Sequence, residues 1–382
     1  MIITNRTGLR PLAAATALAL VLVACGGGGD DAADTTTAST EAPTTTAAAP
    51  TTTARAATTT EAETTTTTTV PPTPREPLSG VEIASFDDID PKPALAVKIN
   101  NHPAARRNHS GLGSADIVFE ELVEGTITRF AAVFHSAGSD PVGPIRSGRS
   151  QDVDLLTSFR EPLFAWSGGN PGVTRLIAES TLTDLNPFRT SAGGAYYRGP
   201  GSTPHNFYST TDRLWALTPE DHPGPPPQQY RYLDEGEDFA GDEAVDSFDL
   251  DIGSIDITWE WDDEQGVWLR SQEGSPHDDV LHGRIDAENV IVMVTEYKPS
   301  TIDARSPEAQ TVGNGPVFVF SDGEVIEGRW QREFNLFALE FVDDEGEVIE
   351  LTPGPTWIEL APAVGTLDVA NPTTDIEIFY AE

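Results

Sequence analysis

The 382-residue chain contains a single cysteine, Cys25, so it cannot form a disulfide within itself. A folded protein of this length that lacks disulfides has to be stabilised by burying apolar side chains in a core. The composition can supply such a core, because 38% of the residues are hydrophobic and the chain includes seven tryptophans and sixteen phenylalanines. The length allows one to three domains of ordinary size.

The N-terminus has the features of a lipoprotein signal peptide. Arg6 and Arg10 precede an apolar stretch, residues 12–22, that is too short to span a bilayer comfortably. The run Leu22-Val23-Ala24-Cys25 is similar to a lipobox, in which the cysteine thiol is acylated and becomes the first mature residue. An ordinary secretory peptide with a chance cysteine is the alternative. We expect residues 1–24 to be removed, and acyl chains such as palmitate on Cys25 to anchor the protein outside the cell membrane.

The formal net charge is −38 at pH 7. A surface this acidic repels phosphate backbones, so we do not expect nucleic acid as a partner. Adaptation to salt or to solubility explains the acidity at least as well as a functional role of the acidic surface. The acidity alone does not indicate a metal site.

Composition divides the rest of the chain into four regions. Residues 25–79 are rich in Thr, Ala and Pro, which predicts a disordered tether or an O-glycosylated stalk. Residues 80–219 combine strand and helix patterns, which predicts an α/β or α+β N-terminal domain. Prolines mark a linker at 220–249. Short aromatic and β-branched runs in 250–382 are typical of a small antiparallel all-β domain.

Several individual elements can be predicted. An apolar run at 94–99 indicates a strand, and the spacing in 150–159 indicates a helix that begins with a capping residue. A strand at 163–166 should be followed by a helix at 171–179. In the second folded region, residues 334–342 are among the expected strands.

Two further expected strands, 117–124 and 127–134, form a hairpin with a two-residue turn. This register places Glu120, Glu124 and Arg129 on the face opposite an apolar one. Such a group could bind a ligand or supply acid–base chemistry. A surface ladder of salt bridges is the alternative.

Arg146 and Arg149 directly precede the helix expected from Ser150. Arginines beside the free amides of a helix N-terminus suit a carboxylate or a phosphate. Asp152 and Asp154 could instead satisfy the same amides and arginines within the protein.

Two loops and one histidine pair complete the candidates. The glycine-rich loop 167–172 lacks the spacing of nucleotide-binding motifs. His205 and Asn206 lie in a Gly/Pro-rich loop, where either a functional or a structural imidazole is expected. His277 and His282 have no known zinc spacing, so we expect no metal ion and no other cofactor.

Several stretches together resemble the YerB-like bacterial lipoproteins, a family that pairs two domains of unknown function behind a lipid-anchored N-terminus. The similar stretches, spread over about residues 90–360, include ALAVKINNHPAARRNHSGLGSADIVFEELVEGTITRFAAVF, GPIRSGR, TPHNFYSTTDRLW, GVWLRSQEGSPHDD and NVIVMV. The resemblance implies functional weight in the first domain on Asn101, Glu120, Glu124, Arg129, Arg146, Arg149, His205 and Asn206. In the second domain it implies weight on His277 and Asp279. One position departs from the family pattern, since Ile99-Asn100-Asn101 stands where an Ile-Asp-Asn run is expected. A catalytic role for that acid therefore does not carry over.

Two functions remain open. The first is non-catalytic binding of an envelope ligand or partner, such as peptidoglycan or the wall-synthesis machinery. The second is a carboxylate-dependent hydrolase or lyase that acts on a wall glycan, with Glu120, Glu124 or His205 as catalytic candidates. Four strand residues separate the two glutamates by about 13 Å at their backbones, which gives no support to a glycosidase pair. We therefore favour binding.

Overall fold

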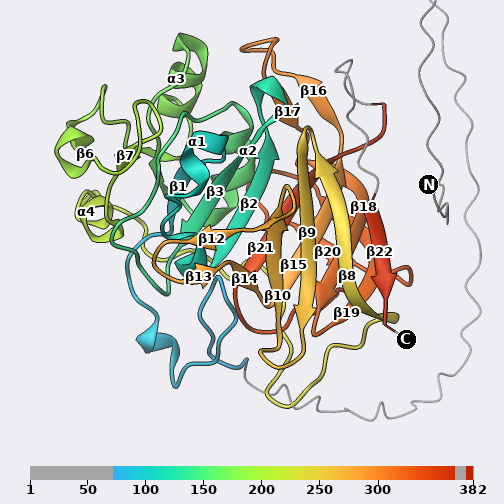
Figure 1. Ribbon diagram of the computed structural model, residues 1–382. Helices are drawn as coiled ribbons and strands as arrows, with labels where there is room; N and C mark the ends of the chain where they lie inside the picture. Colours follow the sequence, from blue (N-terminus) through green and yellow to red (C-terminus); the bar gives the residue numbers. More distant parts are fainter. Residues whose placement is uncertain (1–71, 366–375, 382) are drawn as a thin grey trace, which may run out of the picture. The chain divides into compact units, whose positions relative to one another are not determined.

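The computed structural model describes residues 72–365 and 376–381. The expected signal peptide, Cys25 and most of the expected tether lie outside these residues. Within them, strands from both halves of the chain form one extended sheet (Figure 1). The sheet order is β11-β10-β9-β8-β19-β18-β15-β21-β2-β3-β1-β4-β5.

The N-terminal half has a mixed α/β structure, which confirms the expected fold class. Its strands in the large sheet are β1 (Leu95–Asn100), β2 (Ile117–Leu122), β3 (Thr128–Phe134), β4 (Leu163–Ala165) and β5 (Thr183–Asp184). Its helices are α1 (Pro103–Arg106), α2 (Gln151–Leu156), α3 (Pro171–Ala178) and α4 (Thr211–Trp215). A separate short pair consists of β6 (Tyr197–Arg198) and β7 (Phe207–Tyr208). The strands and helices predicted from the sequence in this half are therefore present.

The C-terminal half consists of strands that pair mainly antiparallel, also as expected. The longer strands are β8 (Glu243–Ile252), β9 (Ile255–Asp262), β10 (Val267–Gln272), β15 (Asn289–Thr295), β18 (Gly313–Ser321), β19 (Glu324–Arg332), β21 (Thr356–Pro362) and β22 (Ile376–Tyr380). The shorter ones are β11 (Ser275–Pro276), β12 (Asp278–Asp279), β13 (Gly283–Arg284), β14 (Asp286–Ala287), β16 (Tyr297–Pro299), β17 (Pro307–Ala309) and β20 (Glu340–Val342). Alternating burial along β8 and β9 shows one face in the core and one in water.

The two halves join through β21, a strand near the end of the chain. It pairs in parallel with β15 on one side and with β2 on the other, where Ile117 lies opposite Thr356. β21 is buried along its whole length, as expected for a parallel strand covered on both faces. The expected boundary between two domains at 219–250 stays a prediction. The halves on either side of it share one sheet, whose backbone hydrogen bonds cross between them.

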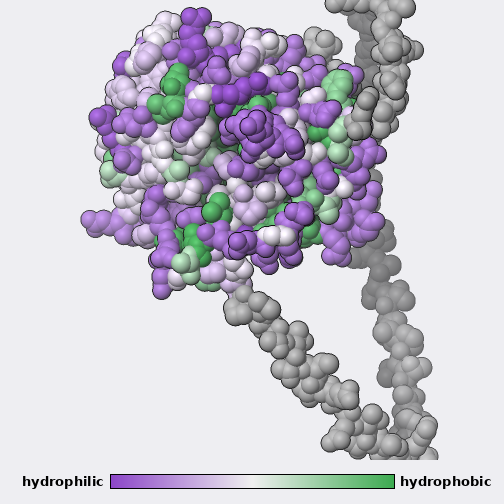
Figure 2. Space-filling model, turned by 60° about the horizontal axis from the view of Figure 1, so that its bottom comes forward, coloured by the Kyte–Doolittle hydropathy of each residue, from purple (hydrophilic) through white to green (hydrophobic). Residues whose placement is uncertain are grey.

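Packing begins before the expected domain start at Gly80. Leu78 is fully buried in the core, and buried Arg75 forms ion pairs with Glu82 and Asp234 at 3.0 and 2.7 Å. The strand expected at 334–342 is shorter than predicted, because only Glu340–Val342 pairs with a neighbour. The exposed surface in Figure 2 is mainly hydrophilic, with separate hydrophobic patches, in keeping with the large net charge.

The register expected for the β2–β3 hairpin is wrong by one residue. Leu122 lies opposite Thr128 and Glu121 opposite Arg129, because the turn has three residues, Glu124-Gly125-Thr126, instead of two. The shift turns Glu120 to the face opposite Arg129. Both faces of β2 are buried, so the expected single apolar face does not exist here.

Candidate functional site

Four arginines and a histidine approach one another on one side of the N-terminal half. We call this group the arginine site, and it consists of Arg129, Arg146, Arg149, Arg198 and His205. Arg129 lies at the start of β3. The segment that carries Arg146 runs beside β1, because the Arg146 amide donates to the Lys98 carbonyl at 2.7 Å. Arg198 lies in β6, and His205 precedes β7.

Arg129 is the buried member of the site, with 6% of its surface exposed. Its Nη1 donates to the Ser147 carbonyl at 2.6 Å, whereas its Nε has no hydrogen-bond partner among the described residues. Burial lowers the pKa of Arg129 to about 9, and the charges of Arg149 and Arg146 contribute in the same direction. A buried donor without a partner is costly, so this guanidinium is suited to accept an anion.

The other arginines add uncompensated positive charge. Half-buried Arg146 has a lowered pKa, first through burial and then through the charges of Arg149 and Arg198. Glu124 offsets part of this charge by pairing with Arg149, whose Nε donates to the carboxylate at 2.9 Å. The Arg149 amide, which lies just before the start of α2, donates to Asp152 at 2.6 Å, so this carboxylate is engaged within the protein. Ser150 precedes α2 but makes no capping bond through its side chain.

His205 is held as a neutral imidazole. Asn100 Nδ2 lies 2.8 Å from His205 Nδ1, and an amide nitrogen can only donate, so Nδ1 accepts and the proton is on Nε2. Burial, followed by the neighbouring charges of His102 and Arg146, lowers the pKa of His205. The His102 and His205 rings stack at 4.3 Å between centroids. Asn206 orients Arg198, because its Oδ1 accepts from Nη1 at 3.0 Å.

A cavity of about 350 Å³ adjoins the arginine site. Glu124, Ser147 and Arg149 line it together with the glycine-rich segment 167–170. The C-terminal half contributes Asp303, from the loop between β16 and β17, whose carboxylate accepts from Asn170 Nδ2 at 3.1 Å. The cavity is therefore built by both halves of the chain.

Glu120 and Asn101 do not belong to the arginine site. Glu120 is fully buried on the other face of β2, and its Oε2 accepts from Arg270 Nη2 at 2.5 Å. Asn101 Nδ2 lies within 3.3 Å of Glu120 and exchanges hydrogen bonds with Gln272. Burial, together with the charge of Glu120, raises the pKa of neighbouring Glu359 well above its usual value. These groups form a polar cluster inside the junction between the halves.

His277 and Asp279 also lie at this junction. Arg270 Nη1 donates to His277 Nδ1 at 2.7 Å, so His277 donates from Nε2 to His109 Nδ1 at 2.8 Å. His109 Nε2 then donates to the Asn100 carbonyl at 2.7 Å. Asp279 is buried and accepts from the Leu281 amide at 2.8 Å. A chain of hydrogen bonds thus runs from Arg270 to Asn100, the residue that contacts His205.

Comparisons with known proteins identify the family. Residues 78–224 match the model described as the N-terminal domain of a protein of unknown function, DUF3048, and residues 249–358 match the model of its C-terminal domain. The chain belongs to the DUF3048 family. The resemblance noted in the sequence is thereby confirmed.

Within the DUF3048 family, the chain is similar to a Bacillus subtilis (strain 168) protein named "Putative lipoprotein YerB". The two are 28% identical over 311 residues, which cover 78% of this chain and 89% of YerB. A crystal structure of YerB from Bacillus subtilis matches with a TM-score of 0.66 and 24% identity, covering 79% of this chain and 99% of the YerB chain. This likeness shows the same fold.

No group of three potential metal-ligating side chains occurs within residues 72–365 and 376–381. In the same residues, no helix has the length and apolar character needed to cross a bilayer.

Some residues near the site were not singled out from the sequence. Lys98 forms fully buried ion pairs with Glu121 and with Asp152, the latter at 2.7 Å. Two features of the sequence could have indicated this buried pair: a lysine inside an apolar run, and Glu121 on a face expected to be apolar. Arg198 could not be found this way, since β6 is two residues long and carries no periodic pattern.

Proposed function

We propose that this protein is a lipid-anchored, extracytoplasmic envelope protein that binds an anionic envelope ligand at the arginine site and catalyses no reaction. Cys25 would carry the anchor, in line with the lipoprotein name of its relative YerB. Wall polymers and their precursors carry carboxylates or phosphates, which are the groups that arginines bind most strongly.

Arg129 carries this proposal. Arg129 is buried, and its Nε is unpartnered among the described residues. The positive charges of Arg146 and Arg149 repel its own positive charge. An anion that accepts from Nε would both satisfy the donor and reduce the repulsion. Glu124 supplies one compensating charge, but Arg149 already engages it.

The glycan hydrolase or lyase has less support. Glu120 lies inside the junction between the halves, where its carboxylate is already engaged by Arg270. Glu124 pairs with Arg149 and has a lowered pKa, which makes it a poor general acid. Neither carboxylate is poised to donate a proton to a glycosidic oxygen.

Calorimetric titration of the mature chain tests the binding function. Muramyl dipeptide supplies a carboxylate, and glycerol phosphate supplies a phosphate. Arg146→Ala should weaken binding of the preferred ligand by about 1.5–3 kcal/mol, the scale of a charge-assisted hydrogen bond. Because Arg146 is only half-buried, the variant should keep its fold.

Arg231→Ala is the matched control, because Arg231 is an exposed arginine in the linker region. It should leave both affinities unchanged. If Arg146→Ala lowers the melting temperature and leaves binding untouched, Arg146 has a structural role and the proposal fails.

A further inference from the structure

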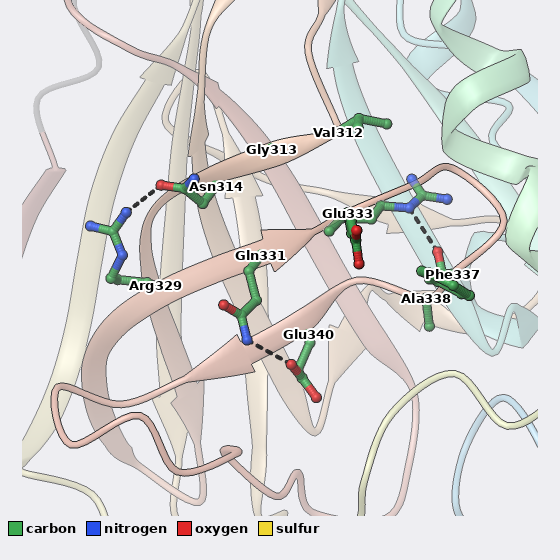
Figure 3. Close-up of a pocket in the computed structure, with 10 residues that line it drawn as sticks. Val312, Gly313, Asn314, Arg329, Gln331, Glu333, Phe337, Ala338 and Glu340 are labelled. Carbon is green, nitrogen blue, oxygen red and sulfur yellow. Dashed lines mark hydrogen bonds between the residues drawn. The ribbon is translucent and has the colours of Figure 1, made fainter. Parts of the chain in front are cut away.

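A second cavity, of about 820 Å³, lies on the C-terminal half, away from the arginines discussed above. It is a groove over the ends of β18, β19 and β20, and Figure 3 shows the side chains that line it. Its size is within the roughly 300–1,000 Å³ of small-molecule sites. The sequence did not indicate a functional role for any of the residues that line it.

Planar polar side chains form the floor of the groove. Asn314, Gln331 and Glu340 lie in one row, directly opposite one another on β18, β19 and β20. Gln331 Nε2 donates to Glu340 at 2.7 Å, and Arg329 donates to Asn314 (Figure 3). Neighbouring strands are about 4.8 Å apart, so the row offers hydrogen-bonding groups at a spacing similar to the length of a sugar ring.

An aromatic side chain, that of Phe337, borders one end of the groove. In Figure 3, Phe337 lies at the end opposite Asn314 and Arg329. Phe334, Leu336 and Phe337 are 55%, 66% and 55% exposed, although they come from one short segment of an otherwise acidic, polar surface. Three exposed large apolar side chains in four residues indicate a contact surface.

The loop that presents these side chains is held in place from below. Buried Arg332 donates from Nε to the Phe337 carbonyl at 2.7 Å and from Nη2 to the Asn335 carbonyl at 2.6 Å. The Phe337 amide also donates to the Phe334 carbonyl at 3.0 Å, and Asn335 Nδ2 donates to Asp154 at 2.7 Å. The backbone of the loop is therefore held in place before any ligand arrives, which reduces the entropy lost on binding.

The charges of the groove select the class of ligand. Two arginines, Arg329 and Arg332, are balanced by two glutamates, Glu333 and Glu340. Because the positive and negative charges of the groove cancel, it does not favour a charged ligand over an uncharged one. Two amides and a carboxylate in one row suit the hydroxyl groups of a sugar, and an aromatic ring suits the apolar C–H face of a pyranose. The groups that line the groove are mainly side chains on the face of three paired strands, which suits a ligand recognised by side chains better than an extended peptide recognised by backbone groups.

We propose that this groove binds an uncharged oligosaccharide, with Phe337 under one sugar ring and the Asn314–Gln331–Glu340 row bonded to hydroxyl or acetamido groups. The site is separate from the proposed anion site and does not depend on it. A tethered envelope protein with both sites would contact the glycan part and the anionic part of a wall polymer at different places.

Saturation-transfer NMR on the mature chain tests the proposal with two trisaccharides, chitotriose and cellotriose. At least one should bind, and Phe337→Ala should weaken that binding tenfold or more. Gln331→Ala should weaken it severalfold. Both side chains are exposed, so these changes should leave the fold intact. Phe86→Ala is the matched control, because Phe86 is 52% exposed in a different part of the fold, and it should have no effect.

Arg146→Ala should also leave trisaccharide binding unchanged, which separates this site from the proposed function. The proposal is overturned if neither trisaccharide binds, or if binding survives both Phe337→Ala and Gln331→Ala. It is also overturned if Phe337→Ala instead abolishes binding to phosphatidylcholine vesicles, since the exposed rings would then contact lipid.

Discussion

Asn100 shows how one residue sets the character of the arginine site. It is almost completely buried, its carbonyl ends the hydrogen-bond chain from Arg270, and its amide fixes the tautomer of His205. The family resemblance leads us to expect an aspartate at this position. An aspartate would accept a hydrogen bond from a protonated His205 Nδ1, and its negative charge would favour the imidazolium form.

We therefore predict that Asn100→Asp raises the pKa of His205 from its lowered value to above 6.5. The change is nearly isosteric, and the carboxylate can still accept from the His102 amide, as Asn100 Oδ1 does at 3.2 Å. NMR titration of the histidine ring signals measures the effect, with the remaining histidines as internal references. An unchanged titration of His205 would show that the contact with residue 100 does not control its charge.

The β2 strand has two buried faces with different charged partners. Glu120 faces Arg270 of the C-terminal half, whereas Glu121 faces Lys98 and Asp152 of the N-terminal half. Burial, followed by the charge of Asp152, raises the pKa of Glu121 to about 7, against the opposing effect of Lys98. Removing one partner of such a group leaves uncompensated charge in the core.

Lys98→Met should lower the free energy of unfolding by about 3–5 kcal/mol at neutral pH. The loss should be larger at pH 8 than at pH 5. A carboxyl whose pKa is raised on folding binds more protons in the folded state, so its contribution is present below the unfolded value of 4.5 and is lost as pH rises through about 7. Without Lys98 this pKa rises further, so ionising Glu121 becomes more costly.

Chemical denaturation at the two pH values measures this effect. Lys92→Met is the control, because Lys92 pairs with Asp90 at a partly exposed position and should change stability by no more than about 1 kcal/mol. Equal losses for the two variants would contradict the role given to the buried lysine.

The elements that could be predicted from sequence are those with strong local patterns. The apolar run of β1 and the N-cap Asn170 followed by Pro171 at the start of α3 are examples. The hairpin register could not be derived, since a two-residue and a three-residue turn fit the same Gly125-Thr126 pair and differ only in which face each side chain takes. The apolar pattern predicts a strand at 334–342, but its first part is a loop in which Phe334, Leu336 and Phe337 are exposed and are not buried against a sheet.

The candidate site was only partly predictable, because local sequence patterns do not show which distant segments pack together. Arg146 and Arg149 stood out beside a helix start, and His205 stood out in its loop. Their proximity to Arg129 and Arg198 depends on long-range packing of the segment before α2 against β1. The register shift places Glu120 on the other face of β2, and its partner there, Arg270, lies 150 residues away in the chain, beyond the reach of any local pattern.

At the scale of the whole molecule, the continuous sheet links halves that correspond to separate family domains. Four residue pairs join β2 and β21, and the Arg270–Glu120 ion pair lies beside them. A protease site inserted at Gly236, in an exposed turn of the linker, allows the halves to be cut apart.

We predict that the cut halves co-elute in size-exclusion chromatography and separate only in denaturant, because the cut leaves the shared core and sheet intact. Independent elution of two folded halves would show that the junction contributes little to stability.

The most direct test of the binding function follows the Arg129 Nε–H group by nitrogen-15 NMR. Muramyl dipeptide and glycerol phosphate are titrated in turn into the mature chain. We predict that one of them shifts the Arg129 signal to saturation, with the dissociation constant found by calorimetry, and that the Arg146→Ala variant requires a higher concentration. A stationary Arg129 signal while the ligand binds elsewhere, or no binding of either anion, would contradict the assignment of this site.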